Sequence, residues 1–236
     1  MISVLLAAAF FAGASECRLP PATLVPGGIL VWEFADEDVF RSHMAPVSDG
    51  YKSFADWAAP HRATPQRQRL DAVIARLEKT GKEGAVKLAR RMRAVSEGRV
   101  GVIDGATCLE ASLIGEANYL RPMSRGPYEF AAAILSRPGA LKVYMELGEG
   151  GSATLIRAKP RIIADLKAGW RGLAHLHNHP FKDDPRVSFI GGMTSPSEDD
   201  VRYYLRRDPP YEQAWITNGF ETFRVRVEDL EAIAPR

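Results

Sequence analysis

The feature that most constrains the fold of this 236-residue chain is a change of hydrophobic period near residue 98. Over residues 64–97, apolar side chains recur every three to four positions, which is the spacing of amphipathic helices. From residue 99 onward, the chain consists largely of short apolar runs separated by Gly and Pro, which is typical of strands. A helical segment followed by a strand-rich remainder predicts an α+β protein.

Residues 64–97 are expected to form a helical hairpin. Thr64 and Pro65 supply a start signal, and Gly81 and Gly98 lie where the two helices would end. The Lys and Arg residues of the second helix are spread around it and are interpreted as a solvated face. The pattern leaves open whether the hairpin belongs to the main domain or covers it.

The remaining apolar runs give the other expected elements. Strands are predicted at residues 29–34, 100–104, 108–115, 130–135, 140–147, 152–158 and 172–179. Helices are predicted at residues 35–40, 51–60 and 160–170, and after Ser197, which is a favourable N-cap. Asn218-Gly219 between two apolar runs predicts a β-hairpin over residues 214–227.

The N-terminus predicts export. Residues 4–14 form an apolar run that is too short to span a bilayer comfortably and ends in the small-x-small pattern that signal peptidase cleaves. We therefore expect a signal peptide over residues 1–16, a periplasmic or extracellular location and no stable membrane anchor. The basic residues that usually open such a peptide are missing, so a buried N-terminal element in a cytoplasmic protein is the alternative.

Cysteine usage and net charge limit the classes of site and partner. Cys17 and Cys108 do not form a C-x-x-C pair, which argues against a zinc–thiolate site. In an exported protein they are able to form a disulfide, and two separate buried thiols are the alternative. The net charge is +2, and no surface combining basic and aromatic residues is evident. A nucleic-acid partner is therefore not expected.

The densest chemical signal is the run HLHNHP at residues 175–180. Alternate residues of a strand point to the same face, so His175, His177 and His179 are expected to line up on one side. Two neutral imidazoles placed in this way chelate one Zn²⁺, and a carboxylate from the first turn of the next helix supplies a third ligand. The fourth position then stays open to water.

The order H-x-H-P followed by P-S-x-x-D resembles the JAMM (MPN or JAB-like) zinc metalloprotease family, and the wording HNHP with SPSEDD is closest to its RadC-like branch. The resemblance covers roughly residues 99–236. It implies a cytidine-deaminase-like mixed β-sheet flanked by helices. It also implies that His177, His179 and Asp200 bind Zn²⁺ and that Ser197 stabilises an oxyanion.

The resemblance also implies an upstream glutamate that acts as general base. Glu129 directly precedes the strand predicted at residues 130–135 and is the preferred candidate, and Glu110 and Glu116 are the alternatives. His175 is expected to be a packed histidine beside the site rather than a ligand.

One departure from the RadC-like pattern concerns the interval between the motif histidines and the motif serine. Seventeen residues separate His179 from Ser197, which is more than that branch has. The excess implies a loop inserted at the mouth of the site over residues 181–194, which either shapes substrate access or blocks it.

Three functions follow from these residues. The preferred one is a zinc-dependent hydrolase of amide bonds, peptide or isopeptide, that acts on a peptide or protein substrate. A non-catalytic scaffold of the same fold and a RadC-like DNA-associated protein are the alternatives. The expected organisation is a signal peptide (1–16), an irregular lead-in with the helical hairpin (17–98) and a metallohydrolase domain (99–236). Neither the role of residues 17–98 nor the oligomeric state is predicted.

Overall fold

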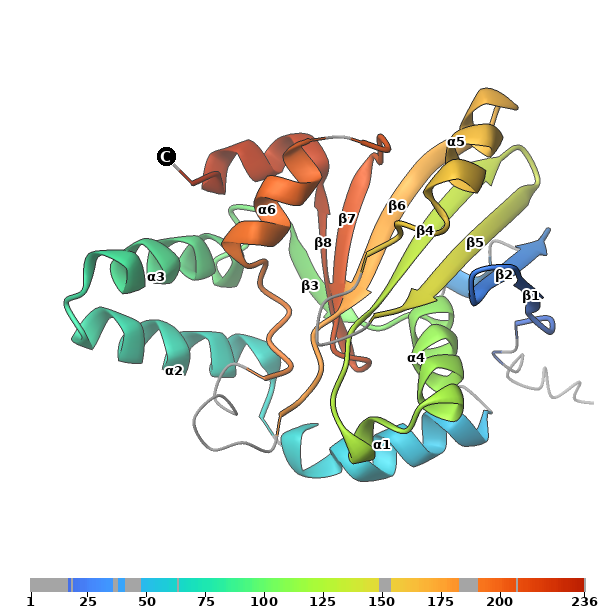
Figure 1. The fold of residues 1–236 in the computed structure, drawn as a ribbon. Coiled ribbons are helices and arrows are strands. Elements are labelled where there is room, and N and C mark those ends of the chain that lie inside the picture. The colour runs from blue at the N-terminus through green and yellow to red at the C-terminus, as the bar shows by residue number, and fades with distance from the viewer. Residues whose placement is uncertain are drawn as a thin grey trace, which may run out of the picture.

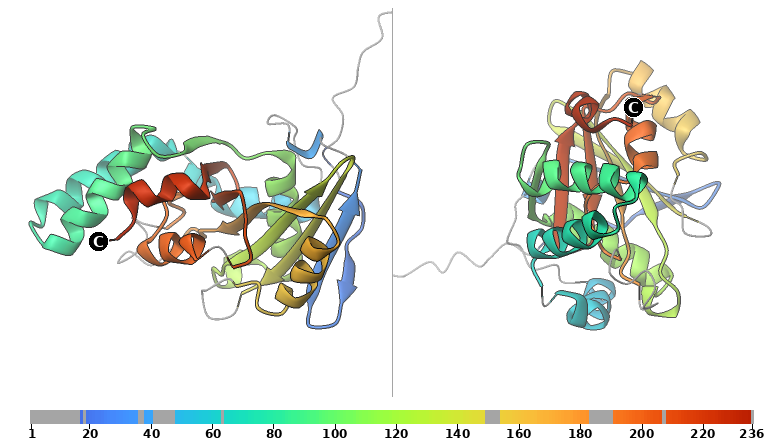
Figure 2. Two further views of the ribbon diagram at one scale, coloured as in Figure 1. Left: turned by 90° about the horizontal axis from the view of Figure 1, so that it is seen from above. Right: turned by 90° about the vertical axis from the view of Figure 1, so that its left-hand side faces the viewer.

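The computed structural model describes residues 17, 19–35, 38–40, 48–62, 64–148, 154–182, 191–206 and 208–235. A β-sheet runs through the centre of the molecule, and helices lie against both of its faces (Figures 1 and 2). Strands and helices are mixed along the chain, so the α+β prediction is confirmed. The predicted signal peptide lies outside the described residues.

The described residues contribute eight strands to one sheet. In spatial order these are β1 (Thr23–Val25), β2 (Ile29–Phe34), β5 (Ala140–Leu147), β4 (Phe130–Arg137), β6 (Arg171–Asn178), β7 (Gln213–Thr217), β8 (Glu221–Arg226) and β3 (Val102–Gly105). Neighbouring strands are antiparallel except β6 and β7, which run parallel. Because β6 lies between β4 and β7, hydrogen bonds on both sides hold the strand that carries the histidines.

One face of the sheet packs against α1 and α4 in a continuous apolar core. The helices of this side are α1 (Asp49–Arg62), α4 (Cys108–Leu120) and the short 3-10 helices η1 (Asp38–Phe40) and η2 (Met123–Arg125). Glycines let α1 and α4 approach closely, since a Cβ added to Gly50 would lie 2.1 Å from the carbonyl oxygen of Gly115.

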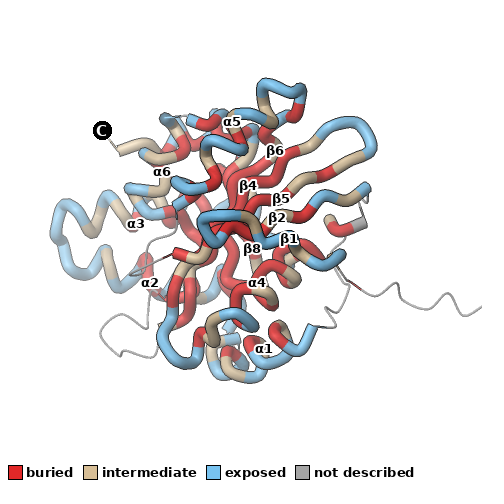
Figure 3. Tube along the Cα trace, turned by 45° about the vertical axis from the view of Figure 1, so that its right-hand side comes forward, coloured by how far each residue is buried: buried red, intermediate tan, exposed pale blue. Residues whose placement is uncertain are grey.

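The opposite face carries the remaining helices, which pack in two further apolar clusters. They are α2 (Gln66–Lys79), α3 (Glu83–Ser96), α5 (Lys159–Lys167), α6 (Glu198–Leu205) and the 3-10 helix η3 (Val227–Ile233). Figure 3 shows buried central strands and an exposed outer end of the α2–α3 hairpin. Among the described helices, none combines the length and the apolar character needed to cross a membrane.

Two of the predicted strands are wrong. Residues 108–115 belong to α4, which begins after Thr107, whose backbone N–H donates to the carboxylate of Glu110. Most residues of α4 are buried between the sheet and α1, so the helix lacks the polar face that marks a helix in sequence. The described part of residues 152–158 leads through a turn into α5 and forms no strand.

Most other predicted elements are confirmed. Strands β2, β4, β5 and β6 lie where the apolar runs placed them, and the Asn218-Gly219 turn joins β7 to β8. Ser197 is the N-cap of α6. Helix α2 starts one residue later than predicted, with Pro65 rather than Thr64 at its N-cap.

The residues that precede position 98 share a sheet and a core with the rest of the chain. β2 pairs with β5, and β1 pairs with β2 at the edge of the sheet. Cys17 forms a disulfide with Cys108 at the start of α4. The α2–α3 hairpin packs on side chains of β7, β8 and α6. The change of period at residue 98 therefore divides the sequence pattern but not the packing of the described residues.

Candidate metal centre

The side chains of His177, His179 and Asp200 meet where β6 ends and α6 begins. The Nε2 atoms of His177 and His179 lie 3.1 Å apart. The carboxylate of Asp200 lies 3.3 Å from His177 Nε2 through Oδ1 and 3.4 Å from His179 Nε2 through Oδ2. Among the described residues, this is the group of potential ligands whose donor atoms all lie within 4.8 Å of one another.

These separations are those expected of three ligands around one tetrahedrally coordinated metal ion, such as Zn²⁺. Ligand atoms held about 2.0–2.1 Å from Zn²⁺ with tetrahedral angles lie about 3.3 Å from one another, close to the distances of 3.1–3.4 Å between the donor atoms here. Two imidazoles and one carboxylate are also the donor set of open catalytic zinc sites. The arrangement predicted from the histidine spacing is therefore present as a possible metal-binding triad.

The sheet leaves room for the histidines beside small residues. Ala131 of β4 is opposite His177, and Ala133 is opposite His175. These alanines are fully buried on the face that carries α5. The predicted alternation of β6 thus holds, because Ala174 and Leu176 point into the core of the other face.

Local helix chemistry places the third ligand. Ser197 Oγ accepts a hydrogen bond from the backbone N–H of Asp200 (3.1 Å), and Asp200 Oδ2 accepts one from the backbone N–H of Ser197 (2.7 Å). This reciprocal capping box fixes the first turn of α6. The same carboxylate that caps the helix therefore faces the two imidazoles.

Hydrogen bonds on the far side of each imidazole orient its ring. His179 Nδ1 lies 2.6 Å from the carbonyl oxygen of Met193. A carbonyl only accepts, so we assign the ring proton to Nδ1, which leaves the Nε2 lone pair facing the centre. His177 Nδ1 lies 2.9 Å from the hydroxyl oxygen of Tyr204 on α6, a contact that the sequence reading did not predict.

The charges of the centre are strongly coupled. Burial favours the protonated carboxyl of Asp200, but His177 and His179 outweigh burial and hold its pKa well below the usual range. Burial alone would lower the pKa of His179, yet Asp200 and the nearby Glu129 raise it overall. Asp200 and Glu129 therefore place negative charge beside His179, which favours a cation there.

A pocket of about 380 Å³ adjoins the centre and is lined by His179 and Asp200. Ser197 and the half-buried Glu129 line the same pocket. The antiparallel register that sets Ala131 opposite His177 brings Glu129 beside His179. The preferred base candidate and the motif serine therefore share one pocket with two of the three ligands.

The alternative glutamates have other surroundings. Glu110 is fully buried, its carboxylate oxygens lie 2.6 and 2.7 Å from Arg224 Nη2, and it also bonds to the backbone N–H of Thr107. Glu116 lines a different pocket, next to Cys17. Of the three glutamates considered as base, Glu129 alone lines the pocket of the metal centre.

Asn178, between the two histidine ligands, ties β6 to the start of β4. Its Oδ1 accepts a hydrogen bond from the backbone N–H of Phe130 (2.6 Å), and its Nδ2 donates to the carbonyl of Tyr128 (3.2 Å). Both partners adjoin Glu129 in the chain, so this buried amide fixes the backbone on either side of the candidate base.

The α2–α3 hairpin also contributes to the pocket. Leu88 and Met92 of α3 form an apolar wall together with Met193. The resemblance does not reach these helices, and sequence spacing gave no signal that they approach the histidines. The hairpin, whose role the sequence left open, thus forms one side of the candidate site.

Both ends of the inserted loop are fixed to the body of the protein. Gly192 donates a backbone hydrogen bond to the carbonyl of Pro180 (2.9 Å), and Arg69 of α2 donates to the carbonyl of Gly191. Phe181 is buried under these contacts. Residues 183–190 of the loop lie outside the described residues.

Comparison with known proteins identifies no relative: no protein-family model, curated protein or solved structure matches the chain.

Proposed function

We propose that this protein is a zinc-dependent hydrolase of amide bonds in peptide or protein substrates, built on a JAMM-like fold. The observation that carries the proposal is the convergence of His177, His179 and Asp200 at the separations of a tetrahedral zinc site. The presence of Glu129 and Ser197 in the adjoining pocket supports it further. A scaffold without catalytic activity would have no need of this complete set of groups.

Each residue has a role that its surroundings allow. When bound, zinc lowers the pKa of water and polarises a carbonyl. The carboxylate of Glu129 accepts the proton of the attacking water and passes it to the leaving nitrogen. Ser197 Oγ already accepts from a backbone N–H, so its own hydroxyl hydrogen is left to donate to the developing oxyanion.

We further propose that the protein acts outside the cytoplasm. The Cys17–Cys108 disulfide supports this location, because such bonds persist mainly in oxidising compartments. Peptides of the cell wall or small peptides then fit better than ubiquitin-like proteins. The DNA-associated alternative has less support, since Arg93 and Lys87 of the basic helix are paired with Glu78 and Glu83.

Metal analysis tests the centre. We expect about one Zn²⁺ per chain in the unchanged protein and a loss of binding in His179→Ala and Asp200→Ala, since each change removes one of three ligands. Asp199→Ala is the matched control, because Asp199 is exposed on the same turn and belongs to no ligand set. Equal zinc content in all four proteins would refute the site.

Glu129→Gln tests the base. The variant keeps its zinc, but its activity on a peptide library read by mass spectrometry is expected to fall by about 10²–10⁴-fold, because no carboxylate then accepts the proton of water. The same change at Glu110 or Glu116 serves as comparison. Full activity in Glu129→Gln would assign the base elsewhere.

A further inference from the structure

The third histidine of the run, His175, shares a hydrogen-bonding partner with the ligand His177. His175 Nδ1 lies 3.1 Å from the hydroxyl oxygen of Tyr204, and His177 Nδ1 lies 2.9 Å from the same atom. His175 and Tyr204 are 2% and 3% exposed, so water does not compete for these contacts. One buried hydroxyl therefore connects a non-ligand histidine to a ligand histidine.

The number of hydrogens available limits the direction of the hydrogen bonds from His177 through Tyr204 to His175. A tyrosine hydroxyl has one hydrogen and two lone pairs, so it donates to at most one of the two histidines. His177 binds a metal through Nε2 only when its ring proton is on Nδ1. In that state His177 donates to Tyr204, and the buried hydroxyl hydrogen of Tyr204 is satisfied by donating to Nδ1 of His175.

The reverse direction is incompatible with metal binding. If Tyr204 donates to His177 Nδ1, the proton of the neutral His177 ring occupies Nε2, the atom that faces His179 and Asp200. The ring then has no lone pair to offer the metal. The ability of His175 to accept a hydrogen bond thus bears directly on whether His177 acts as a ligand.

We propose that His175 and Tyr204 are positioning residues that act as one unit and hold His177 in its metal-binding tautomer. This inference rests on the metal centre of the proposed function. It explains why three histidines alternate along β6 although two of them reach the centre. Residues that orient the ligands of a metal through hydrogen bonds typically account for a 10–100-fold difference in metal affinity.

His175 suits the role of terminal acceptor because its ring is buried and enclosed by aromatic side chains. The aromatic rings of Tyr203 and Tyr211 pack around it, with centroids 5.0 and 5.5 Å from that of the imidazole. Its Nε2 makes no hydrogen bond within the described part of the chain. In the proposed arrangement the ring proton of His175 is on Nε2, where no other hydrogen bond competes with the contact to Tyr204.

The test compares zinc affinities measured by competition with a chromophoric chelator. His175→Leu removes the acceptor, whereas His175→Asn keeps an acceptor oxygen where Nδ1 was, and Leu and Asn have similar size and shape. Tyr204→Phe removes the hydroxyl, and Tyr203→Phe removes the neighbouring one as a matched control. The double variant His175→Leu/Tyr204→Phe tests whether the two residues act together. Thermal unfolding of the zinc-free proteins checks that each variant folds.

We expect His175→Leu, Tyr204→Phe and the double variant to bind zinc more weakly by a common factor of about 10–100, because each breaks the same chain. His175→Asn and Tyr203→Phe should bind zinc as the unchanged protein does. Long-range ¹H–¹⁵N spectra should show the ring proton of His177 on Nδ1 in the zinc-bound protein.

Two results would overturn the inference while leaving the metal centre intact. One is an equal loss in His175→Asn and His175→Leu, which would indicate a packing role. The other is a loss in the double variant equal to the product of the single losses, which would indicate independent effects. If the unchanged protein bound no zinc, the proposed function and this inference would both be wrong.

Discussion

At the scale of single residues, Asn178 shows how one buried amide links stability to the site. Replacing Asn178 by Leu removes its hydrogen bonds to Phe130 and Tyr128. We expect the free energy of unfolding to fall by about 1–3 kcal/mol, because buried backbone groups lose their partners. We also expect a lower kcat/KM at unchanged zinc content, since the backbone around Glu129 is no longer fixed.

The matched control for that prediction is Asn118→Leu. Asn118 of α4 is also buried and also bridges two backbone groups, the N–H of Met123 (2.8 Å) and the carbonyl of Gly50 (3.0 Å). It should lose comparable stability in chemical denaturation but keep its kcat/KM. Equal losses of activity in the two variants would show that Asn178 has no special connection to the base.

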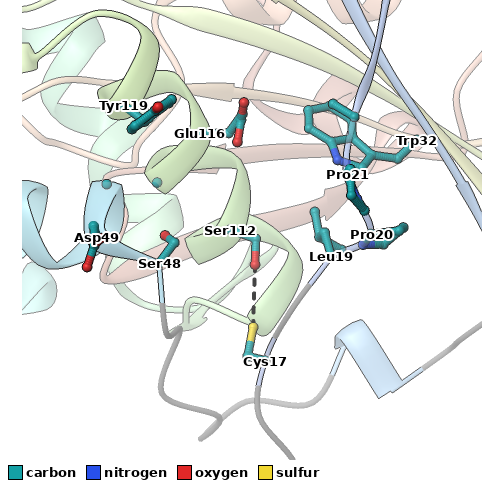
Figure 4. A pocket seen from close by; sticks show the side chains of 13 residues that line it. Cys17, Leu19, Pro20, Pro21, Trp32, Ser48, Asp49, Ser112, Glu116 and Tyr119 are labelled. Atoms are coloured by element: carbon teal, nitrogen blue, oxygen red, sulfur yellow. Dashed lines mark hydrogen bonds between the residues drawn. The ribbon is translucent and has the colours of Figure 1, made fainter.

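Glu116 is a partly buried residue whose charge should destabilise the fold. It lines a pocket of about 580 Å³, which Figure 4 shows with Trp32, Ser112 and Tyr119 around it. Burial raises the pKa of Glu116 above its ordinary value of 4.5. The folded state therefore binds the proton more tightly than the unfolded state, and this group costs stability as pH rises through and above that value.

Glu116→Gln is accordingly expected to raise the melting temperature at neutral pH and to give no gain well below pH 4.5, where the carboxyl is protonated in both states. Glu83→Gln on α3 is the control, because its partner Lys87 lowers the pKa of Glu83 instead. Neutral-pH stabilisation of the Glu83 variant as large as that of the Glu116 variant would contradict the explanation. Zinc content should not change in either protein.

At the scale of elements, the sequence predicted those features that depend only on residues close together in the chain. The alternation of His177 and His179 along β6 and the cap at Ser197 are local patterns, so the candidate ligands were recognisable. Tyr204 was not, because its role appears only when α6 packs over β6. Helix α4 was missed for a similar reason. Most of its residues are buried, so its sequence lacks the regular alternation of apolar and polar residues that marks a surface helix.

Helix α3 contributes to the pocket from a distant part of the chain. Its apolar residues Leu88 and Met92 face the pocket that Glu129 lines. For the proposed amide hydrolase we expect a substrate with an apolar side chain next to the cleaved amide, because such a wall gains free energy by burying apolar surface. Leu88→Glu should shift cleavage of a peptide library towards basic side chains without changing zinc content.

Leu77→Glu on α2 is the control for that prediction. Leu77 is half-buried against the same apolar cluster but does not line the pocket. It should change stability and leave the cleavage preference as it was. A preference that is unaffected by Leu88→Glu would mean that α3 supports the site only structurally.

At the scale of the whole molecule, one disulfide connects regions that the sequence pattern separated. Cys17 precedes β1, and Cys108 starts α4, 91 positions later in the sequence. The enclosed segment contains β1, β2, α1, the α2–α3 hairpin and β3. Closing a loop of this length restricts the unfolded chain and stabilises the fold by about 4–5 kcal/mol in the chain-entropy description.

Cys17→Ser/Cys108→Ser should therefore lower the free energy of unfolding in urea by about 4–5 kcal/mol while zinc content stays the same. A reductant should lower the stability of the unchanged protein towards that of the double variant, and should have no effect on the double variant itself. Because α1 packs on α4 and the α2–α3 hairpin lines the pocket, the loop closed by the disulfide includes a wall of the site. If reductant did not destabilise the unchanged protein, the disulfide would have no stabilising role. It would then no longer support a location outside the cytoplasm.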